Sequence, residues 1–227
     1  MDPARAYPPS YFPEPIEVPE NAAQGPYLPR VAFVRSVVAL HSLTIAATAA
    51  FATWGTVPAL PGSLALFLGA LIVLSAERRL LRNSQLTRLL SPAILVIGLY
   101  GLSGLARPLE DAGLPLEGIA ISAAAALTYV SVCGKAFSYL GLGFLSMVAS
   151  STCLVFLSQG REPGWLASGI VITAAWILYL CYDLSMVVKR RRINEVAPAV
   201  ADLYRDLLNF ALYPGRVWLH WKRYKFL

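Results

Sequence analysis

Charged residues are scarce in this chain of 227 residues. They make up 14% of the sequence, whereas an ordinary globular domain is about one quarter charged. So few charges cannot cover the surface of a soluble protein of this length. Apolar residues instead make up 57%, and the mean hydropathy is +0.58. The composition therefore excludes most soluble classes and indicates that lipid surrounds much of the chain.

Histidine and cysteine are also scarce, with two and three residues. Cys133, Cys153 and Cys181 lack the paired spacing of zinc or redox sites, so we interpret them as packing residues. His41 has no second ligand nearby in the sequence and is interpreted as a packed or hydrogen-bonded residue. Phosphate loops, metal-ligand spacings and Ser/His/Asp arrangements are absent from the sequence. We therefore predict a protein that is not an enzyme and that has no metal site and no cofactor.

The first 29 residues lack an apolar core and do not form a signal peptide. Their eight prolines disfavour a helix and favour an extended tail that is disordered by itself. Within this tail, Pro8, Pro9 and Tyr11 fit the Pro-Pro-x-Tyr pattern that WW domains bind. They are candidate partner-binding residues, although a Pro-rich tail can also contain this pattern by chance.

Six apolar segments follow the tail, and each is long enough to cross a bilayer as a helix. They are residues 33–54, 58–76, 89–106, 116–134, 136–158 and 165–188. Prolines punctuate the segment ends, as they do at helix starts. These prolines are Pro58, Pro61, Pro92, Pro108, Pro115 and Pro163. Gly98, Gly101 and Gly104 recur at close helical spacing, and we interpret them as positions where helices pack tightly.

A seventh segment, residues 196–213, contains Asp202, Arg205 and Asp206. Charged side chains are costly in lipid, so we expect this helix to be buried in the bundle or re-entrant. The predicted fold is an all-α membrane protein, a seven-helix transmembrane bundle with a central, partly polar seventh helix. The bundle covers residues 30–213, between the tail of residues 1–29 and a basic, aromatic tail of residues 214–227.

The net charge is +6, and the Lys and Arg residues lie in short runs between apolar segments. This pattern reflects membrane topology rather than a nucleic-acid-binding face, so we expect no nucleic-acid partner. If the segments alternate in direction, twelve cations fall on one side of the membrane and two, Arg107 and Arg161, on the other. The twelve are Arg5, Arg30, Arg35, Arg78, Arg79, Arg82, Arg88, Lys135, Lys189, Arg190, Arg191 and Arg192. The amino terminus is therefore predicted to face the cytosol or the mitochondrial matrix.

Acidic residues within a membrane bundle are candidates for function. The three candidates are Asp183, Asp202 and Asp206. Asp183 and Asp206, if they meet across two helices, would share a proton and act as a pH-dependent latch. The alternative is that the acids only neutralise Arg78, Arg79 or Arg190 in structural ion pairs.

Four short motifs follow one another along the chain. They are Arg30-Val-Ala-Phe-Val-Arg35, Lys135-Ala-Phe-Ser-Tyr-Leu-Gly141, Tyr179-Leu-Cys-Tyr-Asp183 and Asp202-Leu-Tyr-Arg-Asp206-Leu-Leu-Asn209. In order and spacing they resemble the transmembrane Bax inhibitor motif family, which includes Bax inhibitor-1 and the lifeguard proteins. The resemblance covers residue 30 to about residue 213.

The resemblance implies a seven-helix bundle and a pH-sensitive calcium leak in an intracellular membrane. That membrane is the mitochondrial inner membrane, the endoplasmic reticulum or the Golgi. The pH sensor and ion gate of the family fall on Asp183, Asp206 and Arg78, with Arg79 as the rival arginine. The implied partners are the lipid bilayer and calcium ions.

The sequence also leaves a structural role open. Arg205 stands where the family has an apolar residue, and a cation beside the acids would repel an entering divalent ion. Asp202 and Arg205 are therefore secondary candidates for the site. In this alternative the chain keeps the scaffold without transport and is an accessory subunit of a larger membrane complex, such as a mitochondrial respiratory assembly. Other subunits of that complex would contact the amino-terminal tail.

Overall fold

The computed structural model describes residues 20–80 and 85–212, except for the side chains of residues 75–80, 85–89 and 207–212. This part of the chain consists of seven α-helices and one short 3-10 helix, without a β-strand. The elements are η2 (Ala22–Gln24), α1 (Tyr27–Trp54), α2 (Leu60–Leu80), α3 (Gln85–Asp111), α4 (Leu116–Val132), α5 (Tyr139–Leu157), α6 (Pro163–Arg190) and α7 (Val196–Leu212). The prediction of an all-α fold is confirmed.

Four helices in the described ranges are long and apolar enough to cross a membrane. These stretches are Tyr27–Trp54, Leu90–Asp111, Tyr139–Leu157 and Pro163–Arg190. The apolar stretches Leu60–Leu74 of α2 and Leu116–Val132 of α4 are shorter. Length and composition thus indicate a membrane protein, with four rather than six full-length apolar helices among the described residues.

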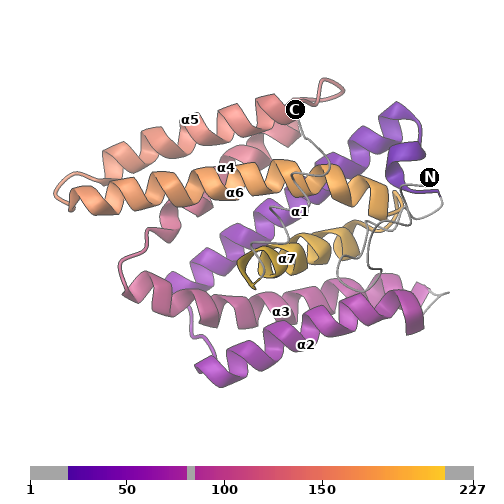
Figure 1. Cartoon of the computed structure of the whole chain (residues 1–227), viewed down its shortest axis with the longest axis horizontal. Coiled ribbons are helices and arrows are strands. Elements are labelled where there is room, and N and C mark those ends of the chain that lie inside the picture. Colours follow the sequence, from indigo (N-terminus) through magenta and orange to yellow (C-terminus); the bar gives the residue numbers. More distant parts are fainter. Residues whose placement is uncertain (1–19, 81–84, 213–227) are drawn as a thin grey trace, which may run out of the picture.

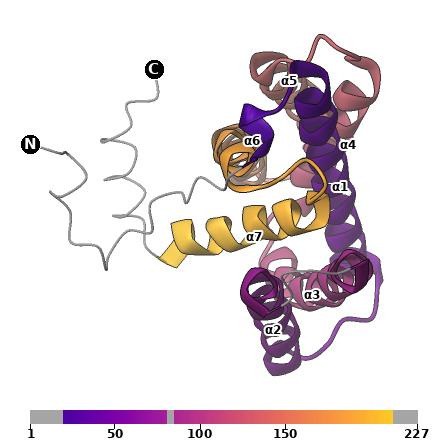
Figure 2. The same cartoon turned by 90° about the vertical axis from the view of Figure 1, so that its right-hand side faces the viewer.

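The helices form two groups joined by α1 (Figure 1). On one side α2 and α3 pack together, and on the other side α4, α5 and α6 pack together. Helix α7 lies between α6 and the α2–α3 pair, as Figure 2 shows, and it contacts α1 as well. The seventh helix is therefore central, as expected.

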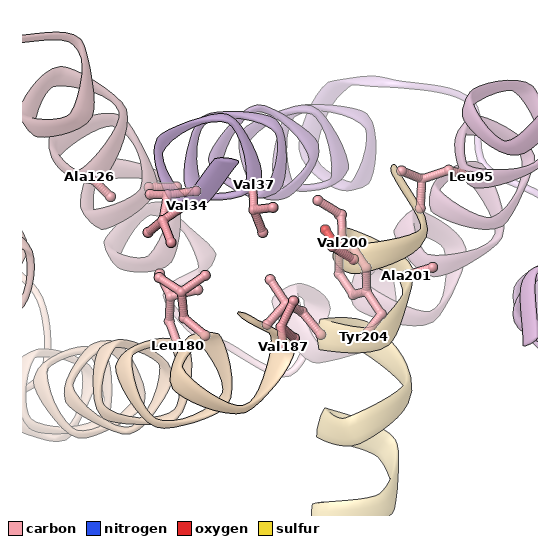
Figure 3. Close-up of a cluster of buried hydrophobic side chains, with 14 of the residues drawn as sticks. Val34, Val37, Leu95, Ala126, Leu180, Val187, Val200, Ala201 and Tyr204 are labelled. Carbon is pink, nitrogen blue, oxygen red and sulfur yellow. The ribbon is translucent and has the colours of Figure 1, made fainter. Parts of the chain in front are cut away.

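Apolar side chains from α1, α6 and α7 converge on a shared core (Figure 3). Val37, Leu180, Val187 and Val200 are almost completely buried in it, together with the ring of Tyr204. Since Val200 and Tyr204 are one turn apart, they form one apolar face of α7. This face explains why a helix that contains three charged residues still packs inside the bundle.

Glycines allow α2 and α3 to approach each other closely. A Cβ atom on Gly101 would lie 2.6 Å from the carbonyl oxygen of Ser63 and 2.7 Å from the backbone nitrogen of Phe67. A Cβ atom on Gly98 would lie 2.8 Å from the Cβ atom of Ala70. Real Cβ atoms do not come so close to backbone atoms, so only glycine fits at Gly101. The interpretation of these glycines as packing residues is confirmed.

Two predictions about helix starts are wrong. Pro92 and Pro108 lie inside α3, because this helix begins at Gln85 and continues to Asp111. A proline inside a helix removes one backbone hydrogen bond. A membrane bundle tolerates this loss because groups on neighbouring helices can bond the freed backbone carbonyl. Pro115 and Pro163, in contrast, do lie at the starts of α4 and α6.

The boundary between the tail and the bundle also lies earlier than predicted. Helix α1 begins at Tyr27, although residues 27–29 were expected to be extended. Pro26 is the cap residue, and Pro29 lies in the first turn, where the missing N–H would have no helical partner. These two prolines are therefore compatible with a helix. Residues 1–19 lie outside the described residues.

Candidate functional site: an acid and arginine cluster between α6 and α7

The turn between α6 and α7 brings the three candidate acids together. Asp183 lies about two turns before the end of α6, and Asp202 and Asp206 lie one turn apart on α7. Helix α6 ends at Arg190, and the cap residue Arg191 adopts an extended backbone conformation. Because the chain reverses there, the end of α6 faces the first half of α7.

Arg191 and Asp202 form a buried ion pair. Arg191 Nε donates to Asp202 Oδ2 at 2.5 Å, and a terminal nitrogen donates to Oδ1 at 2.8 Å. Each side chain is 3% exposed. Two parallel hydrogen bonds of this kind fix the geometry as well as the charge. The pair therefore ties the end of α6 to α7.

A second ion pair joins Arg190 to Asp206, and both side chains are about four-fifths buried. Arg205 connects the two pairs. One of its terminal nitrogens lies 3.0 Å from Asp202 Oδ1, and its Nε lies 3.5 Å from Asp206 Oδ1. The expectation of a cation beside the acids is confirmed, and this cation contacts both carboxylates of α7.

Asp183 is buried more completely than Asp206, and a tyrosine of its own helix binds it. The hydroxyl of Tyr179 lies 3.1 Å from Asp183 Oδ2 and 2.9 Å from the backbone carbonyl oxygen of Leu203. This hydroxyl thus links α6 to α7 within the bundle. Asp183 lies within electrostatic range of Asp206 and Arg190. Among the described residues Asp183 bonds Tyr179, and Asp206 pairs with Arg190 and Arg205, so the structure does not join the two acids directly.

Two arginines of the described residues pair with Asp206: Arg190, the partner named in the ion-pair alternative, and Arg205. Arg78 and Arg79 belong to α2, but their side chains lie outside the described part of the chain. The candidate partner-binding residues of the tail, Pro8, Pro9 and Tyr11, lie outside it too.

Sequence reasoning missed Tyr179 and Arg191 as members of the site. Tyr179 precedes Asp183 by four residues, a spacing at which helical side chains meet, so this contact could have been predicted. Arg191 was counted only as one of a run of cations at a helix end. Nothing in that run shows which arginine turns inward, because the choice depends on where α6 ends.

The segment before α1 contacts the connection between α6 and α7 next to the cluster. The backbone N–H of Ala22 donates to the carbonyl oxygen of Arg191 at 2.8 Å. Asn21 is buried next to it, and its side chain accepts a hydrogen bond from the backbone of Gln24. Glu20 reaches Arg192 at 3.7 Å. Residues 20–24 therefore bind the connection between α6 and α7.

His41 lies apart from the cluster, in the core between α1, α6 and α7. Its ring stacks on Trp176 with a centroid distance of 6.0 Å, and the ring of Tyr204 lies 5.0 Å away. Tyr204 shares a hydrogen bond of 2.7 Å with Thr44. His41 is thus a packed residue, as interpreted from the sequence. No group of three His, Cys, Asp or Glu residues within the described ranges could hold a metal ion.

The cluster has the chemistry of a proton-sensitive tie between two helices. Ionised carboxylates hold the arginines through charge-assisted hydrogen bonds, and protonation of a carboxylate removes the charge that holds its partner. Comparison of the chain with protein-family models, with curated proteins and with solved structures finds no match.

Proposed function

We propose that the protein is a proton-sensitive calcium leak in an intracellular membrane and that the cluster between α6 and α7 is its gate. One observation carries this proposal: connected ion pairs between acids and arginines, buried or half-buried, join two neighbouring helices of a membrane protein. Such groups are costly within a bundle and mark ion or proton pathways. The resemblance of the four sequence motifs to the transmembrane Bax inhibitor motif family supports the same function.

The gate depends on the charges that face the three carboxylates. From α6 these groups are Tyr179 and Arg190, together with Arg191 at its cap, and from α7 the group is Arg205. When the carboxylates are ionised, the arginines hold α7 against the end of α6. Protonation at low pH neutralises the carboxylates and weakens these ties, since a neutral acid no longer attracts a guanidinium group. Calcium flux should therefore increase as the pH falls.

Calcium flux into liposomes that contain the full chain tests this proposal directly. A wild-type flux that rises from neutral to acidic pH is expected, because α7 is then released. The double variant D183N/D206N should lose most of this pH dependence, since Asp202 is then the only one of the three carboxylates that can be protonated. Asp111 provides the control, because it pairs with Arg107 on α3 and is 66% exposed. The variant D111N should keep the wild-type pH profile.

Two results would contradict the proposal. An unchanged pH profile in D183N/D206N would show that the two acids do not gate the flux. The absence of any wild-type flux at any pH would show that the protein is not a calcium leak.

A structural role is the second candidate, and the position of Arg205 favours it. Its guanidinium group contacts Asp202 and Asp206, so a positive charge occupies the place where a divalent ion would need carboxylate oxygens. In this case the chain is an accessory subunit of a larger membrane complex, and the cluster only stabilises α7.

Gentle purification from the native membrane, followed by determination of the native mass, separates the two functions. A stable large assembly without calcium flux would support the accessory subunit. A protein that purifies alone and conducts calcium would support the leak, and R205L should then increase the flux because the blocking charge is gone.

A further inference from the structure

Two basic residues lie at one end of the bundle, Arg30 beside the ring of Tyr27 and Lys135 in a connection whose backbone binds the Tyr27 hydroxyl. Arg30 is in the first turns of α1, and Lys135 lies in the connection between α4 and α5. The hydroxyl of Tyr27 donates to the backbone carbonyl of Lys135 at 2.9 Å, which holds this connection against α1. The guanidinium carbon of Arg30 lies 5.8 Å from the centroid of the Tyr27 ring. Tyr139, the first residue of α5, lies within electrostatic range of Arg30.

Neither cation has a carboxylate partner within the part of the chain that the structure describes. The ion pairs found there use the cations Arg107, Arg190, Arg191, Arg192 and Arg205. One nitrogen of Arg30 donates to the carbonyl of Ala23 at 3.1 Å, which fixes the side chain without neutralising it. Lys135 is exposed. The site therefore presents two positive charges that an anion can neutralise.

An exposed apolar stripe begins beside these charges. Leu140 and Phe144, one turn apart on α5, are 83% and 70% exposed. Val132, at the end of α4, is strongly exposed as well. Tyr27 and Tyr139 are 52% and 38% exposed, and tyrosines favour the boundary between lipid headgroups and acyl chains. The surface is positive at one end and apolar along its length.

We propose that this surface binds an anionic phospholipid. Arg30 and Lys135 bind the phosphate of its headgroup, the tyrosine hydroxyls lie at the boundary, and an acyl chain lies along Leu140 and Phe144. Basic residues at the end of a membrane helix bind anionic headgroups in this way, and the planar guanidinium group of arginine suits phosphate oxygens. The apolar stripe favours a lipid over free phosphate, which has no apolar part. This site is separate from the gate proposed above.

Native mass spectrometry of the full chain in mild detergent tests the site. Phosphatidylglycerol should bind more tightly than phosphatidylcholine with the same acyl chains. The double variant R30Q/K135Q should weaken phosphatidylglycerol binding by about thirty-fold, the effect of losing two cations near the membrane surface. The variant R30K/K135R keeps both charges and should keep the binding.

The matched control is K189Q. Lys189 is an exposed cation in the last turn of α6, so this variant also removes one surface charge. It should bind phosphatidylglycerol as the wild type does. Because Arg30 also holds a backbone carbonyl, the single variant K135Q provides a measurement that does not disturb this contact. It should weaken binding about five-fold.

Three outcomes would overturn the proposal. Equal loss of binding in K189Q and K135Q would mean that lipid binding depends on the net charge of the protein and not on Lys135 in particular. Equal wild-type affinity for the two lipids would show that there is no anion site. Complete displacement of phosphatidylglycerol by inorganic phosphate would assign the site to a free anion instead.

Discussion

Arg191 holds the connection between α6 and α7 through both its side chain and its backbone. The guanidinium group binds Asp202 in a buried pair, and the carbonyl oxygen accepts the N–H of Ala22. Removing one partner of a buried ion pair is more damaging than removing both, because the remaining charge stays buried without compensation. The adjacent Arg192 is 49% exposed and reaches Glu20 only at 3.7 Å, so it should contribute little.

The variant R191M is expected to lower the free energy of unfolding by about 3 kcal/mol, the lower end of the range for a broken buried ion pair. The reason is that Asp202 would remain buried after losing its bidentate partner, with Arg205 still 3.0 Å from its Oδ1. Thermal unfolding in detergent, monitored by circular dichroism, measures this effect. R192M provides the control and should cost about 0–1 kcal/mol, as an exposed pair does. The double variant R191M/D202L should be more stable than R191M, and a similar loss in R191M and R192M would contradict the assignment.

Tyr204 gives a second prediction at the scale of a residue. Its buried hydroxyl shares a hydrogen bond of 2.7 Å with Thr44, which also bonds the backbone carbonyl of His41. Y204F should therefore destabilise the protein by about 1 kcal/mol, the net value of one hydrogen bond. The control is Y100F, because the Tyr100 hydroxyl makes a longer bond of 3.2 Å at an exposed site. If Y100F lowers the free energy of unfolding as much as Y204F does, the buried hydrogen bond stabilises the protein no more than the exposed one.

At the scale of elements, glycine allows the backbones of α2 and α3 to come very close together. The backbone of α2 at Ser63 and Phe67 occupies the space where a side chain on Gly101 would lie. Gly69, also on α2, has no atom within 4 Å of the position of a Cβ. The two glycines differ in their surroundings although both are in helices, so they form a matched pair for substitution.

G101V should destabilise the protein by about 1–3 kcal/mol, because the added carbons force α2 and α3 apart. G69V should change the free energy of unfolding by less than about 1 kcal/mol, since the space around Gly69 is open and valine has a slightly higher helix propensity than glycine. Thermal melting of the two variants under the same detergent conditions checks this prediction. Equal melting temperatures would show that the close approach of the two helices contributes nothing to stability.

Helix α7 shows how far the sequence predicts an element. Residues 196–213 were predicted to form a helix that is either buried in the bundle or re-entrant, and the structure places this helix inside the bundle from Val196 to Leu212. Its neighbours were not predictable, because an apolar face shows only that some partner covers it. Figure 2 shows that these neighbours are α6 on one side and the α2–α3 pair on the other.

At the scale of the whole molecule, three of the described basic segments lie at one end of the bundle: the start of α1, the connection between α4 and α5, and the end of α6. Arg35 donates to the carbonyl oxygens of Val130 and Gly134 at 2.7 Å and 3.2 Å, which brings the start of α1 next to the connection between α4 and α5. The end of α6 lies near the start of α1 through Ala22. Arg107 instead bonds the carbonyl oxygen of Ala52 near the opposite end of α1.

This arrangement predicts the membrane topology. Ala136 and Gln159 flank α5, whose 19 residues separate them by roughly 28 Å. In sealed vesicles of a cysteine-free variant, A136C and N194C should react with an impermeant maleimide from one side and Q159C from the other. The same three variants in opened vesicles are the control and should all react. Labelling of all three positions from one side would exclude α5 as a membrane-spanning helix.

The sequence by itself determined the class of the protein and the approximate position of each helix. Apolar length and charge distribution are properties of contiguous residues, so they can be read without knowledge of the fold. Only the tertiary structure decided which arginine binds which acid. Arg190 and Arg191 are neighbours in one basic run, yet they pair with Asp206 and Asp202. These pairs exist because α6 ends at Arg190 and the chain then turns back, bringing side chains that are 16 and 11 residues apart to the same place.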